Sequence, residues 1–162
     1  MPVDVKKAKR REIHFDTLDD ALADAEAMTE QHTATGNWTP AQNIWHVAFA
    51  IGMLNRGVDL KVPVPMKIFG RVLKLFGAHL KPINPGIKPP AKVAKFFEPP
   101  ADVSLEDAKQ KMRDEVAYAN KHGMNHPSPL FGRLTPDDAV KLNCRHAELH
   151  FGFIHPLESS ES

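Results

Sequence analysis

The sequence predicts an all-α fold of the four-helix-bundle type. Three observations favour it: apolar residues recur at helical spacing in four long segments, each of these segments begins at a capping residue, and none alternates as a strand would. The segments are residues 17–32, 39–57, 104–122 and 135–154. Four long helices in 162 residues are typical of a bundle. We expect one domain over residues 1–162, with its core at about 17–155.

Composition excludes several classes of function. The chain has 21 basic and 20 acidic residues, so its total charge predicts no nucleic-acid partner. Its one cysteine, Cys144, excludes an internal disulfide and fits a reducing compartment. Residues 1–13 are basic, carry no secretory signal and are expected to be a solvated terminus. No apolar run approaches the roughly 18 residues that span a bilayer. These features predict a cytoplasmic protein without a membrane span.

The first two predicted helices differ in how much of their surface is apolar. Residues 17–32 form an amphipathic helix that begins at Thr17 and is closed by the Gly36-Asn37 pair. The second begins with a capping box at Thr39 and ends at Gly57. Its central run is apolar on all sides except for His46, which we therefore expect to be interior. Taken alone, His46 is most simply a core histidine bonded to a neighbouring group.

Residues 58–103 form a long proline-rich insertion that holds eight of the 14 prolines. It carries one short basic amphipathic helix, predicted over 66–81. We expect this insertion to be a cap packed on the core, with a lid, a dimer contact or contact with an anionic membrane as alternatives. The side expected to pack on the core holds Met66, Phe69, Leu73, Phe76 and Leu80.

The last predicted helix has a polar side and an apolar side. At about 100° per residue, one stripe is predicted to face solvent; it holds Lys141, Arg145, Glu148 and Gly152. His146 and His150 point to the opposite side, one turn apart, and are expected to be interior. Residues 156–162 are expected to form a disordered tail, which is polar from Glu158 onward.

Three predicted interior histidines indicate a metal site better than three unrelated packing events. His46, His146 and His150 offer three imidazoles, which leave a position open for water or substrate. Protease helices of the H-E-x-x-H type place glutamate beside the first ligand, whereas Glu148 lies on the predicted solvent stripe. Cys144 is expected to be a small buried thiol. Imidazole ligands do not distinguish zinc, nickel, iron and copper.

Three motifs give the chain a family resemblance. They are Thr39-Pro-Ala-Gln-Asn-Ile-Trp45-His46, the loop from His126 to Thr135, and His146-Ala-Glu-Leu-His150. Together they resemble the DinB/YfiT-like family, in a DinB-like branch catalogued only as a domain of unknown function. The resemblance covers about residues 17–154 and implies an up-down-down-up four-helix bundle. It also implies a divalent metal ion on His46, His146 and His150. Some members of the family are thiol-dependent S-transferases.

Three functional hypotheses remain open from the sequence. One is a metal-dependent hydrolase or S-transferase, in which the ion activates water or a low-molecular-weight thiol for reaction with a small-molecule substrate. Another is a non-catalytic metal- or small-ligand-binding protein, such as a stress-associated homodimer. The last is a structural bundle with satisfied core histidines. Residues predicted to orient a ligand or line the pocket are Asn43, Trp45, His126 and Asn143.

Overall fold

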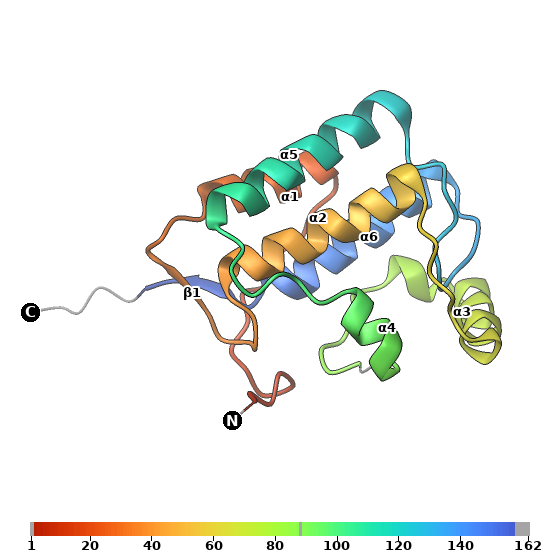
Figure 1. The fold of residues 1–162 in the computed structure, drawn as a ribbon, viewed down its shortest axis with the longest axis horizontal. Coiled ribbons are helices and arrows are strands. Elements are labelled where there is room, and N and C mark those ends of the chain that lie inside the picture. Colours follow the sequence, from red (N-terminus) through yellow and green to blue (C-terminus); the bar gives the residue numbers. More distant parts are fainter. Residues whose placement is uncertain (1, 88, 158–162) are drawn as a thin grey trace, which may run out of the picture.

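The computed structural model describes residues 2–87 and 89–157, and these are mostly helical. The all-α prediction is thereby confirmed. Four helices lie alongside one another (Figure 1): α1 (Leu18–Ala27), α2 (Pro40–Arg56), α5 (Leu105–His122) and α6 (Pro136–Phe151). Both α1 and α2 contact α5 and α6. In Figure 1, α2 and α5 run in one direction, and α1 and α6 run in the opposite direction.

The apolar core is centred on α2. Ile44, Val47 and Ile51 have no exposed surface, and they belong to one buried cluster with Met112 of α5 and Phe151 of α6. Burying each large apolar side chain contributes about 1.5–3 kcal/mol. This packing fixes the positions of α2 and α6, the two helices that carry the three histidines.

The predicted helix starts are confirmed by their caps. Thr39 accepts a hydrogen bond from the backbone N–H of Gln42, whose side chain accepts one from the N–H of Thr39. Thr135 caps α6 through the N–H of Asp138. Each helix then has proline in its first turn, where the missing N–H costs no internal hydrogen bond. Gly57 ends α2 with φ of 78°, a conformation that favours glycine.

The prediction of one helix over residues 17–32 is wrong beyond Ala27. Met28 takes an extended conformation, and the chain then forms β1 (His32–Ala34). This strand pairs antiparallel with β2 (Ile154–Pro156), with Ala34 opposite Ile154. This small two-stranded sheet was not predicted. Each strand has only three residues, which is too short for alternation to indicate it.

The C-terminal boundary also differs from the prediction. Helix α6 ends at Phe151 because the chain leaves it at Gly152 to enter β2. The predicted disordered tail is wrong for Pro156, which lies in β2, and for Leu157, whose N–H donates to the carbonyl oxygen of Gln31. The remainder of that predicted tail, residues 158–162, lies outside the described residues.

The polar stripe of α6 is exposed at Lys141, as predicted, but residues 10–15 cover it nearer the C-terminal end of the helix. Glu148 is only 8% exposed, and its carboxylate accepts a 2.7 Å hydrogen bond from the backbone N–H of Phe15. The same carboxylate pairs with Arg145 at 2.8 Å. Arg10 donates to the carbonyl oxygens of Glu148 and Leu149. The expectation of a solvated terminus over residues 1–13 is therefore wrong for Arg10 and Arg11, whose side chains donate to backbone carbonyl oxygens of α6.

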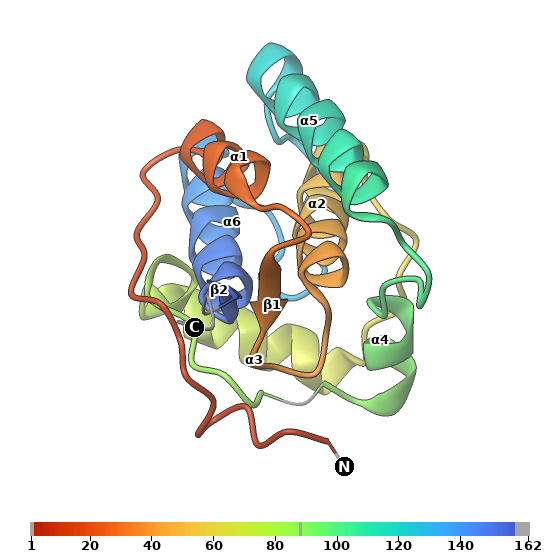
Figure 2. The same cartoon turned by 90° about the vertical axis from the view of Figure 1, so that its left-hand side faces the viewer.

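The insertion contains α3 (Val64–Leu75), the 3-10 helix η1 (Ala78–Leu80) and α4 (Ala91–Phe96), the last of which was not predicted. Helix α3 lies crosswise to the four long helices (Figure 2). The predicted packing of its apolar side is wrong for Phe69 and Phe76, which are 60% and 73% exposed. Instead Gly70 faces inward, against the Leu130 loop. Within the described residues, no helix is both long and apolar enough to cross a membrane.

Candidate metal centre

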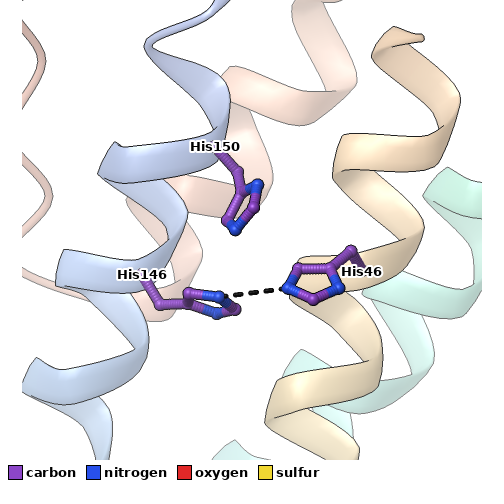
Figure 3. A group of neighbouring side chains, drawn as sticks. All are labelled: His46, His146 and His150. Atoms are coloured by element: carbon purple, nitrogen blue, oxygen red, sulfur yellow. Dashed lines mark hydrogen bonds between the residues drawn. The ribbon is translucent and has the colours of Figure 1, made fainter. Parts of the chain in front are cut away.

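Three histidines meet between α2 and α6 (Figure 3). The Nε2 atoms of His46 and His146 are 3.2 Å apart. One ring nitrogen from each of His46, His146 and His150 lies within 4.8 Å of the others. His46 is 7% exposed, and the other two rings are half-buried. The structure thus brings together the three residues that helical spacing and the family resemblance indicated.

Hydrogen bonds fix the orientation of two of the rings. The Nδ1 atom of His46 lies 2.9 Å from the carbonyl oxygen of Phe97, which can only accept, so this nitrogen carries the proton. The Nδ1 atom of His150 lies 3.1 Å from Oδ1 of Asn43. The amide nitrogen of Asn43 donates to two backbone carbonyl oxygens, which identifies Oδ1 as the acceptor. In both rings Nε2 therefore carries no proton, so its lone pair can bind a cation. In the structure the Nε2 atom of His46 accepts a hydrogen bond from Nε2 of His146.

The spacing of the nitrogens fits a divalent transition metal. Two nitrogens that each bind a tetrahedral ion at about 2.0–2.1 Å lie about 3.3 Å from each other. The 3.2 Å between the His46 and His146 nitrogens is close to this value. In Figure 3 a ring nitrogen of His150 points toward the space beside these two atoms. The donor set and the spacing are thus close enough for one metal ion to be held by the three histidines.

All three rings are held neutral, which is the state that binds metal. Burial, and secondarily the neighbouring His46, lowers the pKa of His146 to about 3. The pKa of His150 also lies well below its ordinary value. Burial is the main cause, and the nearby His146 is the second. The pKa of His46 is lowered by burial too, and the Phe97 carbonyl partly offsets this effect.

These pKa shifts predict that the metal-free protein loses stability in mild acid. The unfolded chain binds protons as the pH falls through 6.5, whereas folded His146 stays neutral until about pH 3. The free energy of unfolding should therefore decrease as the pH is lowered across this window, by up to about 1.4 kcal/mol per pH unit for each such histidine.

Urea unfolding with a chelator at pH 7.5, 6.5 and 5.5 (about one unit apart) measures this dependence. It should be reduced in His146→Gln and unchanged in His122→Gln, an exposed control. A pH-independent wild type would contradict the assignment.

Trp38 lies against the histidines and was missed in the sequence. Its ring stacks on His150 with centroids 5.5 Å apart and an interplanar angle of 16°, and its centroid lies 4.7 Å from that of His46. The only sequence signal is its place directly before the Thr39 cap of the helix that carries His46. The Phe97 carbonyl was missed as well, since a backbone acceptor has no residue signature.

Of the four other predicted site residues, one contacts the histidines and three lie elsewhere. Asn43 contacts His150 as described above. The ring of Trp45 instead stacks on Phe49 at 5.1 Å and approaches α5. The Asn143 amide donates to a carbonyl oxygen one turn earlier in its own helix. His126 lies at the C-terminal end of α2, where its N–H donates to Leu54, whereas His46 lies near the opposite end. Only Asn43 among these four has a described contact with the histidines.

Removal of the Asn43 side chain should weaken metal binding. An Asn43→Ala variant leaves Nδ1 of His150 without its acceptor, and losing such a partner typically costs 10–100-fold in affinity. Asn143→Ala is the matched control, because that equally buried amide bonds only within its own helix. Competition with a chromogenic chelator measures both affinities. Equal losses in the two variants would show that Asn43 does not orient the ligand.

Cys144 takes no part in this site. Its side chain is completely buried in the apolar core, as predicted. Burial raises the pKa of the thiol to about 11, so the reactive thiolate is scarce at neutral pH.

Comparisons with known proteins give a family but no activity. No curated protein and no solved structure matches the chain. One family, described as "Protein of unknown function (DUF1569)", matches residues 7–157. This match covers most of the chain, so the protein belongs to the DUF1569 family.

Proposed function

We propose that this protein is a metal-dependent enzyme that holds a divalent ion on His46, His146 and His150 and acts on a small-molecule substrate. The observation that carries the proposal is the convergence of three neutral imidazoles, two of which have their far nitrogens engaged by Phe97 and Asn43. Three protein ligands leave at least one position open for a further ligand, as in catalytic rather than structural zinc sites.

The proposed reaction type is hydrolysis or S-transfer. A bound divalent ion would lower the pKa of a water or of a low-molecular-weight thiol and so supply a nucleophile at neutral pH. Because Cys144 is buried in the core, a thiol nucleophile has to come from a small molecule. The protein contributes the fixed ring orientations of His46 and His150, and Trp38 provides an aromatic wall beside them.

We also infer that the four long helices form an up-down-down-up bundle of the DinB/YfiT-like type. Support comes from the shared direction of α2 and α5, which lie side by side, and the opposite direction of α1 and α6 (Figure 1). Parallel neighbours need a connection that returns along the bundle. Residues 58–103 provide that length between α2 and α5.

The alternative is a non-catalytic metal- or small-ligand-binding protein. The burial of His46 under Trp38 and Phe97 favours it, because aromatic cover restricts access to the ring from that side. In this alternative the protein would bind an ion with the same three histidines but would not turn over a substrate.

A turnover screen separates the two functions. Protein reconstituted with zinc, nickel or iron is assayed with electrophiles plus thiols, and with esters and amides. The enzyme proposal predicts turnover that requires metal and is lost in His150→Ala. Turnover that persists in His150→Ala would show that another site is responsible. Stoichiometric metal without turnover on any substrate class would favour the non-catalytic alternative.

A further inference from the structure

Helix α3 and its C-cap carry an apolar surface that points away from the rest of the protein. Six side chains at helical spacing are between 44% and 85% exposed: Val64, Ile68, Phe69, Val72, Leu75 and Phe76. We call them the α3 apolar face. Monomeric soluble proteins rarely expose so many large apolar side chains together, and such a patch marks an interaction site.

The opposite side of α3 is fixed to the protein, so the α3 apolar face cannot turn inward. A Cβ atom at Gly70 would lie 2.3 Å from the carbonyl oxygen of Leu130, which shows that the α3 backbone rests directly on this loop. His79 of the adjoining η1 is also buried, and η1 packs on α6. Helix α3 lies at the periphery, crosswise to the long helices (Figures 1 and 2).

The charge around α3 is strongly one-sided. Residues 60–97 contain eight lysines and arginines and no aspartate or glutamate, whereas the rest of the chain has 13 basic and 20 acidic residues. Lys67, Arg71 and Lys74 lie along one flank of the α3 apolar face. Within the described residues, no lysine or arginine of this segment forms an ion pair with a carboxylate. The segment therefore presents uncompensated positive charge.

We propose that α3 docks this protein on the surface of an anionic lipid bilayer. The α3 apolar face enters the boundary between headgroups and acyl chains, and the flanking basic side chains contact anionic headgroups. A helix with a large apolar side and lysine or arginine beside it binds membranes in this way without crossing them. Each basic residue near an anionic surface adds attraction that salt weakens.

Other partners satisfy only part of these observations. Nucleic acid would neutralise the basic residues but would leave Phe69, Leu75 and Phe76 in water. A second copy related by a twofold axis would cover the apolar face but would bring two positively charged segments together. An anionic bilayer complements both the apolar side chains and the charge.

Vesicle flotation of the full chain tests the proposal. We expect binding to phosphatidylcholine vesicles that contain about 30% phosphatidylglycerol to be at least about tenfold stronger than to phosphatidylcholine alone. Binding to the anionic vesicles should decrease at about 0.5 M NaCl. Equal binding to the two vesicle types, or none to either, would overturn the proposal.

Paired variants test the apolar contribution. Leu75→Ser/Phe76→Ser should reduce binding to the anionic vesicles at least about tenfold. The control is Val3→Ser/Leu157→Ser, which removes two exposed apolar side chains outside α3. All four positions are exposed, so circular dichroism should show unchanged folding. Equal losses in the two variants would overturn the assignment to α3.

A second pair separates the local charge from the net charge. Lys67→Glu/Arg71→Glu should abolish the preference for anionic vesicles. Lys121→Glu/Lys141→Glu changes the net charge equally, at exposed positions of α5 and α6, and should keep most of the preference. Equal effects would overturn the proposal. So would tighter binding to duplex DNA, or a dimer in sedimentation velocity that Leu75→Ser/Phe76→Ser dissociates while vesicles remain unbound.

Discussion

His146→Ala should remove stoichiometric metal binding. His146 lies beside both other rings, with its Nε2 atom 3.2 Å from that of His46 and its ring centroid 4.7 Å from that of His150. The variant leaves two imidazoles, which bind a divalent ion far less tightly than three. We expect an affinity loss of at least about 100-fold, since losing even an outer partner of a ligand costs 10–100-fold. Elemental analysis after dialysis, together with chelator competition, measures this loss.

The control for this variant is another histidine. His122→Ala lies on α5, is exposed, and is outside the candidate metal centre. It should bind metal with the wild-type stoichiometry and affinity. If His146→Ala retained the wild-type metal stoichiometry, the three-histidine site would be excluded.

Glu148→Ala should cause the largest loss of stability among single substitutions of polar residues near the site. Its carboxylate is the shared partner of the Phe15 N–H and of Arg145, and it lies 3.2 Å from Nδ1 of His14. Removing one partner of a buried charged pair leaves the other uncompensated and typically costs 3–5 kcal/mol. The expected result is a decrease of this size in the free energy of unfolding, measured with urea at pH 7.5 (about one unit above the histidine range).

The control is Glu12→Ala, which removes an exposed glutamate from the adjacent N-terminal segment. Its effect should stay within about 0.5 kcal/mol, as for most surface substitutions. Because Glu148 contacts the N-terminal segment and has no described contact with the three histidines of the candidate metal centre, folded Glu148→Ala should still bind metal. A stability change as small as that of Glu12→Ala would show that this network does not hold residues 10–15 on α6.

The sequence predicted the three clustered histidines because they depend on local patterns. The spacing of His146 and His150 defines one side of a helix, and His46 interrupts an apolar run, which is a strong sign of burial. Trp38 and the Phe97 carbonyl could not be found in the same way. They reach the histidines from a loop and from the end of the insertion, and their position depends on tertiary packing.

The wrong predictions, like the missed contacts of Trp38 and Phe97, arise from tertiary packing. Glu148 was placed on a solvent side because helical periodicity describes two sides of one helix and cannot show a segment that packs over the polar one. The apolar residues of α3 were expected to face the core, yet Gly70 provides the inward contact because it alone allows the backbone to approach the Leu130 loop. Predicting both features requires knowledge of which distant segments meet.

X-ray absorption at the metal edge of the zinc-loaded wild type tests the central claim most directly. Three imidazoles from His46, His146 and His150 predict nitrogen ligands at about 2.0–2.1 Å, with the multiple scattering typical of imidazole rings and no sulfur from the protein. The fitted number of imidazoles should be three, and it should fall to two in His150→Ala. A sulfur ligand at about 2.3 Å, or fewer than two imidazoles in the wild type, would contradict the proposed centre.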